Sequence, residues 1–210
     1  MTAHIRSAML YVILTFVGIA AFLYPFLLPS RALPSEAHAG DAPLLSAIIA
    51  GLAVLTVAFE LRRRTMSSAT IAILGVLTAV CALLRLLDLP GGGSGIFFLV
   101  VLAGAAFGPR FGMLLGLSAM ALSAVLTGGL GPWLPFQMLA LAWIGAGAGW
   151  LGLASRRLPV IAECAVLAGY GWACAFAYGA VMNLWFWPFQ RGGGDLAWTP
   201  GMSVAETLAH

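Results

Sequence analysis

The chain has 210 residues, of which 62% are hydrophobic and only 8% are charged. Soluble domains carry about 25% charged residues, so the composition excludes a water-exposed surface for most of this chain. The net charge of +3 comes from arginines in short segments between apolar runs. That placement indicates membrane orientation rather than nucleic-acid binding.

Seven apolar runs follow one another along the chain, and short polar or glycine-containing segments separate them. A membrane-spanning helix needs roughly 20 apolar residues. We predict spans at residues 8–29, 43–61, 67–88, 95–108, 111–128, 136–154 and 159–187. The predicted fold is therefore an all-α, polytopic membrane helix bundle of about seven spans.

The first run could be a secretory signal peptide, because Arg6 precedes it and Ala37-His38-Ala39 resembles a cleavage site. The run is longer than the roughly 7–15 apolar residues of a signal peptide, and it ends well before that triplet. We therefore interpret it as the first membrane span.

The fourth and fifth runs meet at Phe107-Gly108-Pro109-Arg110. Proline removes a backbone donor, and glycine permits a tight turn. The sequence therefore predicts two antiparallel helices at this point rather than one long helix.

The arginines distribute unequally between alternate loops. With the N-terminus in the cytoplasm, the cytoplasmic segments hold seven of the ten arginines, namely Arg6, Arg62, Arg63, Arg64, Arg110, Arg156 and Arg157. Positive charge favours the cytoplasmic side of a membrane. We predict a multi-pass protein of the plasma membrane with a cytoplasmic N-terminus.

Three segments rich in glycine, aromatic or amide side chains then lie on the outer face, at residues 90–95, 127–138 and 182–190. Binding sites need apolar walls and a few polar groups, which these segments provide. The alternative is that the glycines only form turns and that aromatics such as Trp185-Phe186-Trp187 form an interfacial belt.

Arg85 is the only arginine inside a predicted span, three residues before Asp88. That spacing allows an ion pair between them at the outer end of a helix. The side chain either snorkels to the membrane boundary or contacts a ligand.

The third predicted span carries small residues at intervals of three and four, namely Ala72, Gly75, Ala79 and Ala82. Small residues allow two membrane helices to approach closely. The stripe predicts either packing within the bundle or docking of a partner subunit.

Enzyme chemistry has little support in the sequence. It contains no P-loop, HExxH or GxSxG motif. Cys81, Cys164 and Cys174 lie in apolar runs without CxxC spacing. We expect no catalytic residue, no cofactor and no metal site.

The region 82–152 resembles the substrate-binding S component of energy-coupling factor (ECF) transporters, especially an actinobacterial branch. The segments that carry the resemblance are the Arg85 helix end, Phe97-Phe98-Leu99, residues 102–104, 107–112 and 128–138, Tyr178-Gly179 and residues 183–189. The glycine-proline-tryptophan segment at 128–138 is the most specific of these. The resemblance extends over most of the chain from about residue 67.

The resemblance implies a six-helix core at residues 66–210 that captures a vitamin or related micronutrient, of cobalamin type, after a two-helix extension at residues 1–65. It also implies a coupling (T) subunit and two ATPase subunits as partners, besides membrane lipid. The branch has a final helix after the region near Glu206, so this core is expected to lack its last helix, either through C-terminal shortening or by nature.

Candidate substrate-binding residues are Arg85, Gly129, Trp133, Phe136, Gln137, Asn183 and Trp187. Candidate docking residues are Ala72, Gly75, Ala79 and Ala82. The competing hypothesis is a non-transporting membrane scaffold, in which Trp133 and Asn183 serve only packing. A membrane enzyme would instead require activity that depends on Arg85 or Asp88.

Overall fold

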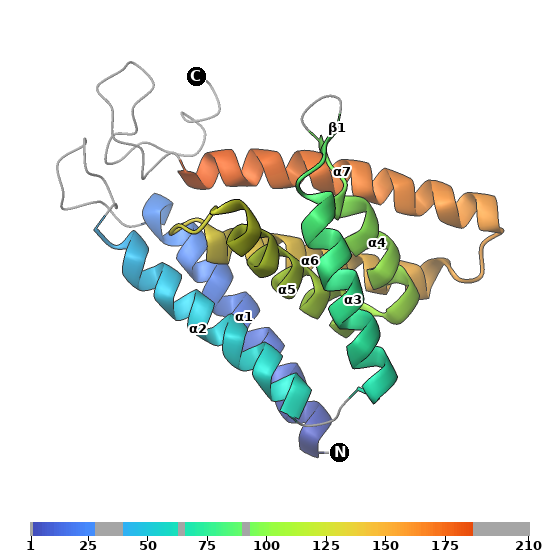
Figure 1. Ribbon diagram of the computed structural model, residues 1–210, viewed down its shortest axis with the longest axis horizontal. Helices are drawn as coiled ribbons and strands as arrows, with labels where there is room; N and C mark the ends of the chain where they lie inside the picture. The colour runs from blue at the N-terminus through green and yellow to red at the C-terminus, as the bar shows by residue number, and fades with distance from the viewer. Residues whose placement is uncertain (1, 28–39, 63–65, 90–92, 187–210) are drawn as a thin grey trace.

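A computed structural model describes residues 2–27, 40–62, 66–89 and 93–186 (Figure 1). Within these residues the chain forms seven helices and one short pair of strands. The helices are α1 (Thr2–Leu27), α2 (Ala42–Arg62), α3 (Ser68–Leu84), α4 (Ile96–Phe107), α5 (Pro109–Thr127), α6 (Leu134–Ser155) and α7 (Val160–Phe186). Strands β1 (Asp88–Leu89) and β2 (Gly93–Ser94) pair antiparallel between α3 and α4. The predicted all-α bundle is confirmed.

The predicted turn between the fourth and fifth spans is confirmed. Gly108 separates α4 from α5 with a backbone φ of +93°, a conformation that side-chain-bearing residues rarely adopt. Pro109 is the first residue of α5, where a missing backbone donor does no harm.

The third span ends earlier than predicted. We expected a helix to residue 88, but α3 ends at Leu84 and Arg85 is its C-cap, with a backbone N–H that donates to the Cys81 carbonyl. A turn and β1 then follow, so Arg85 lies at a helix end and not inside a span. A cation is favourable there because of the helix dipole.

The centre of the bundle is a seam where α4, α5 and α6 pack backbone against backbone. The glycines of this seam are Gly104, Gly112, Gly116, Gly145, Gly149 and Gly152. A Cβ atom on Gly116 would lie 2.6 Å from the Cα of Ala142, and one on Gly152 would lie 2.7 Å from the Cα of Ala105. Only glycine permits helices to approach this closely.

The helices α1 and α2 form an N-terminal hairpin that crosses the bundle diagonally (Figure 1). Its two helices contact each other, and both contact α6. Gly18 of α1 packs on the side chain of Leu139, and the Trp143 indole Nε1 donates to the Thr15 hydroxyl at 3.3 Å. The hairpin is thus joined to the central helix by both apolar and polar contacts.

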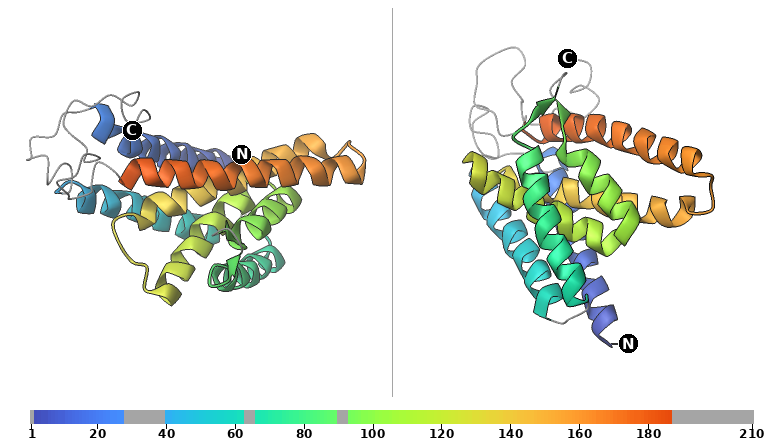
Figure 2. Two further views of the ribbon diagram at one scale, coloured as in Figure 1. Left: turned by 90° about the horizontal axis from the view of Figure 1, so that it is seen from above. Right: turned by 45° about the vertical axis from the view of Figure 1, so that its right-hand side comes forward.

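Helices α3 and α7 lie on different sides of the central seam (Figure 2). α3 packs on α5 and α4, whereas α7 runs antiparallel to α6 and also contacts α4. Large side chains of α7 remain uncovered, among them Ile161, Trp172 and Phe176. α7 is therefore the least enclosed of the core helices.

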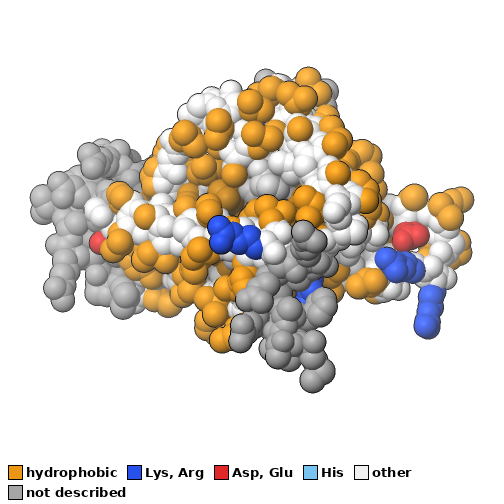
Figure 3. Space-filling view, turned by 60° about the horizontal axis from the view of Figure 1, so that its bottom comes forward, with side chains coloured by type: hydrophobic (Ala, Val, Ile, Leu, Met, Phe, Trp, Pro, Cys, Tyr) orange, Lys and Arg blue, Asp and Glu red, His pale blue; other side chains and the backbone are white. Residues whose placement is uncertain are grey.

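The surface is suited to a bilayer. Four helices, α2, α5, α6 and α7, are long and apolar enough to cross a membrane, while α3, α4 and residues 9–24 of α1 form shorter apolar stretches. Figure 3 shows hydrophobic side chains over most of one face, with arginine side chains near its middle and at the α6–α7 turn. Charge confined to helix ends is typical of membrane proteins.

Candidate functional site

Arg85 is held by a serine that the sequence analysis did not identify. The Arg85 Nη1 donates to the Ser123 hydroxyl at 2.8 Å, and that hydroxyl donates in turn to the Met120 carbonyl at 2.9 Å. Ser123 is completely buried in α5. A serine within an apolar helix was the only signal available in the sequence. The bond fixes a half-buried guanidinium at the junction of α3 and α5.

Tyr178 of α7 is within electrostatic range of this guanidinium. The Tyr178 ring packs edge-on against Phe97 of α4, with ring centroids 5.1 Å apart. Helices α3 and α5 are therefore joined at this charge by a direct hydrogen bond, and α4 and α7 contribute a pair of aromatic rings that pack on each other.

The predicted residue Phe136 lies in an aromatic stack at the same end of the bundle. Its ring centroid is 4.4 Å from that of Trp185 in α7 and 6.0 Å from that of Phe22 in α1. Phe136 and Trp185 are only 2% and 1% exposed. The interfacial-belt interpretation is wrong for Trp185, which is a core residue.

The segment between α5 and α6 begins with a glycine turn. Gly128 has a backbone φ of +67°, and the Gly129 N–H donates to the Ala124 carbonyl at 2.9 Å. Gly131 packs against the Trp133 indole, which leaves no room for a side chain there. We call residues 128–133 the glycine-tryptophan loop. Trp133 is half-buried, so its indole is part of the folded bundle.

Gln137 presents an unfilled hydrogen-bond acceptor in the first turn of α6. Its Oε1 atom is buried and has no hydrogen-bond partner among the described residues. Buried amide oxygens normally accept a hydrogen bond. A polar ligand with an N–H or O–H group would satisfy it.

The remaining predicted site residues have different surroundings. Gly129 is partly buried in the glycine-tryptophan loop, whereas Asn183 is exposed on α7. Trp187 and the expected missing last helix concern residues 187–210, outside the described part of the chain. The side chain of Asp88 is not among the described side chains either, so its pairing with Arg85 stays a prediction.

The small-residue stripe of α3 is mostly uncovered. Ala72, Gly75 and Ala79 are exposed, and a Cβ atom on Gly75 would meet nothing within 4 Å. Ala82 is fully buried. Three of the four predicted docking residues thus present a smooth face without a neighbour in the described part of the chain.

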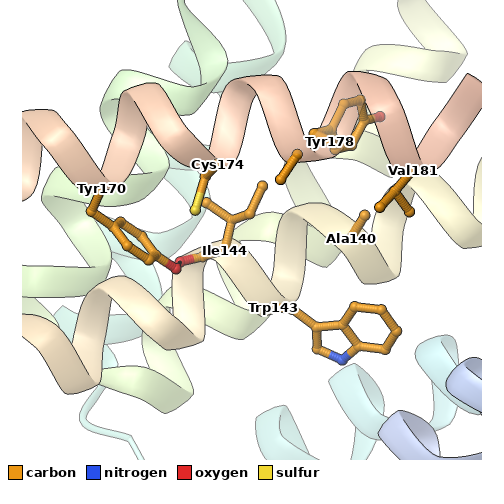
Figure 4. Close-up of a pocket in the computed structure, with 8 residues that line it drawn as sticks. Ala140, Trp143, Ile144, Tyr170, Cys174, Tyr178 and Val181 are labelled. Carbon is orange, nitrogen blue, oxygen red and sulfur yellow. Dashed lines mark hydrogen bonds between the residues drawn. The ribbon is translucent and has the colours of Figure 1, made fainter.

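Apolar grooves open between helices in the described part of the chain. One of about 300 Å³ lies between α6 and α7, one of about 730 Å³ between α1, α5 and α6, and one of about 630 Å³ between α4 and α7. Figure 4 shows the first, where Tyr170 reaches from α7 to the Ile144 carbonyl at 2.9 Å and Trp143 points away from α7. None of the six predicted substrate-binding residues that the structure describes lines any of these grooves.

A second polar cluster lies at the opposite end of the N-terminal hairpin. Glu60 near the end of α2 is 2% exposed, and the Tyr11 hydroxyl of α1 lies beside its carboxylate. Arg110 of α5 is near enough to Tyr11 to act on it electrostatically. The sequence did not predict this cluster, because its members are far apart along the chain.

The end of the bundle that holds Arg85 therefore also carries an unfilled acceptor in Gln137 and the buried ring of Phe136, which are the kinds of group that orient a small organic solute. Within the described residues, no three His, Cys, Asp or Glu side chains gather to hold a metal ion.

The comparison with known protein families gives a match to the part of the chain that follows the N-terminal hairpin. A family model described as the substrate-specific component of ECF transporters matches residues 69–204, well over half of the chain. Neither the curated proteins nor the solved structures give a match. Proteins of the matched family bind a small-molecule substrate and couple to T and ATPase subunits. The chain, an integral membrane protein, belongs to the family of ECF transporter substrate-specific components.

Proposed function

We propose that this subunit captures a vitamin or related micronutrient at the Arg85 end of the bundle, for ATP-driven uptake. The observation that carries the proposal is a half-buried guanidinium that a buried serine holds at the same end of the bundle as the aromatic side chain of Phe136. The Ser123 bond holds Arg85 in place, and Tyr178 lies close to its charge. A ligand carboxylate, phosphate or carbonyl would bind such a cation, while its rings pack on aromatic walls. A cobalamin-type vitamin follows from the resemblance to the actinobacterial branch.

The orientation belongs to the same proposal. Seven of ten arginines lie on the N-terminal side of the membrane, so the Arg85 end faces outward and meets extracellular solute. Cysteines introduced at exposed Gly40 and Arg156, in a background where the native cysteines are alanine, test this. A membrane-impermeant maleimide added to intact cells is expected to label position 40 only. Labelling of position 156 alone would show that the orientation in the membrane is the reverse of the one proposed.

The exposed face of α3 is the proposed docking surface for the T subunit. Gly75→Leu would add a bulky side chain where nothing now stands, and it should abolish co-purification of T and ATPase subunits while substrate binding persists. Val76→Leu is the matched control, because Val76 is a neighbouring residue that is already 64% exposed. Equal subunit loss in both variants would contradict this assignment. Residues 1–65 are proposed as an extension and residues 66–210 as the transporting core.

Binding of a tritiated vitamin panel to the purified protein in nanodiscs tests the capture function. Arg85→Ala should weaken binding of the recognised vitamin by about tenfold or more, because a hydrogen bond to a charged group contributes about 1.5–3 kcal/mol. Ser123→Ala keeps the charge but removes its anchor, so a smaller loss is expected. Arg62→Ala, an exposed arginine at the other end, is the control.

If the wild-type protein binds no vitamin and no T or ATPase subunit co-purifies with it, the proposed function is wrong. If Arg85→Ala and Arg62→Ala bind the vitamin equally well, capture does not occur at Arg85. Size-exclusion profiles of all variants separate loss of binding from loss of folding.

A further inference from the structure

The N-terminal hairpin lies outside the region that the family model matches, which begins at residue 69. Its helices are nevertheless packed on the core at both ends. At one end, the Ser46 hydroxyl of α2 donates to the Pro132 carbonyl at 2.6 Å. At the other, Tyr11 of α1 and Arg110 of α5 line the same groove, and buried Glu60 of α2 lies beside the Tyr11 hydroxyl. A segment attached at both ends moves with the core rather than independently of it.

The Ser46 hydrogen bond ends at Pro132, inside the glycine-tryptophan loop. Glycines at 128, 129 and 131 give this loop a large backbone entropy to lose on ordering. Its own backbone bonds lie at its edges, from Gly129 to Ala124 and from Leu134 to Gly131. Between these edges, Ser46 provides a hydrogen bond from outside the loop. Ser46 is only 8% exposed, so water competes little for that hydroxyl.

Aromatic packing reinforces the same contact. Phe22 of α1 packs edge-on against Phe136, in the first turn of α6. Phe136 in turn contacts Trp185 of α7. The hairpin therefore supports the loop through Ser46 and the helix that follows the loop through Phe22.

We propose that the N-terminal hairpin acts as a brace of the substrate site, which means that its contacts hold part of that site in position. Ser46 is the residue that positions the glycine-tryptophan loop. The inference rests on the proposed function in one respect, namely that this loop contacts the substrate. A braced loop has less ordering entropy to lose when ligand binds, so affinity rises without any direct contact between Ser46 and ligand.

Amide hydrogen exchange on the full-length protein in nanodiscs, without ligand, tests the brace. Ser46→Ala should speed exchange of the Gly129 and Leu134 amides by about fivefold, the effect of losing one typical hydrogen bond. Exchange in the α5–α6 seam should not change. Thr56→Val is the matched control, because it removes a buried hydroxyl of the same helix whose bond to the Leu52 carbonyl stays within α2.

Vitamin-panel binding with the same variants tests the consequence. Ser46→Ala should raise the Kd of the recognised vitamin about fivefold, and Thr56→Val should not change it. Unchanged loop exchange in Ser46→Ala would overturn the brace. Faster loop exchange with unchanged Kd would overturn its role in binding. If no vitamin binds the wild type, the proposed capture function fails, while the exchange measurement still decides whether the brace exists.

Discussion

Helices α6 and α7 have nearly equal mean hydropathy, and both are long enough to cross a membrane, yet the bundle encloses only one of them. In the most apolar stretch of α6, 67% of residues are buried, against 6% in α7. α6 carries glycines and alanines that match glycines on α5, so its backbone approaches neighbouring backbones. α7 also carries glycines and alanines, but a Cβ atom on Gly169 or Gly179 would meet nothing within 4 Å, and large side chains such as Trp172 and Phe176 are exposed. The match of small residues across an interface, not hydropathy, therefore distinguishes the central helix from the peripheral one.

The largest effect is expected at the seam. Gly145→Leu places a side chain against the backbone of Gly112 and should destabilise the fold by at least about 3 kcal/mol. Gly169→Leu is the same change on α7, where a Cβ atom meets nothing within 4 Å, and should stay within about 0.5 kcal/mol. Unfolding in SDS, followed by circular dichroism, measures both. Similar losses of unfolding free energy in the two variants would contradict the distinction between a central α6 and a peripheral α7.

Truncating an aromatic side chain on each helix gives the next largest difference. Phe136→Ala should cost about 3 kcal/mol, because it opens a cavity beside Trp185 and Phe22. Phe176→Ala on α7, where the ring is 65% exposed, should cost less than about 1 kcal/mol. The same SDS titration applies. Comparable values would mean that α7 is covered by protein after all.

The contact between the two helices should be sensitive to a single methyl group. A Cβ atom on Gly147 would meet the Tyr170 hydroxyl, so Gly147→Ala should push α7 away and cost about 1 kcal/mol. The same substitution in a Tyr170→Phe background should cost much less, because the obstructing oxygen is gone. A double-mutant cycle of unfolding free energies measures this coupling. A coupling of zero would show that α7 does not depend on this contact.

The smallest effect is expected from Tyr170→Phe alone. It removes the hydrogen bond that Tyr170 donates to the Ile144 carbonyl across the α6–α7 groove. Hydrogen bonds between membrane helices contribute about 0.6 kcal/mol on average. A loss above about 2 kcal/mol would make this bond a principal attachment of α7, contrary to the weak packing seen here.

Local chemistry made much of the fold predictable. The helix boundaries follow the apolar runs within a few residues, and Gly108-Pro109 ends one helix and begins the next because of backbone constraints that belong to those two residues. The predicted third span was too long, because apolar residues continue after Arg85 although the helix ends at Leu84. Candidate site residues such as Arg85 and Phe136 stood out by charge or by neighbouring glycines. The partner Ser123 did not, because it does not differ from ordinary residues of an apolar helix until another helix is placed against it. Trp185 did stand out, but as part of an interfacial belt and not as a buried partner of Phe136.

The sequence by itself determined that this is a membrane protein and, within a few residues for most of the helices, where those helices lie. Those properties depend on each segment's transfer from water to lipid and on local backbone chemistry. Only the tertiary structure decided that α6 is central and α7 peripheral, that Ser123 holds Arg85, and that Ser46 of the hairpin reaches Pro132. Those outcomes depend on shape and hydrogen bonding between segments as many as 86 residues apart. In a bilayer every helix is already in an apolar medium, so hydropathy cannot rank its neighbours and close packing must.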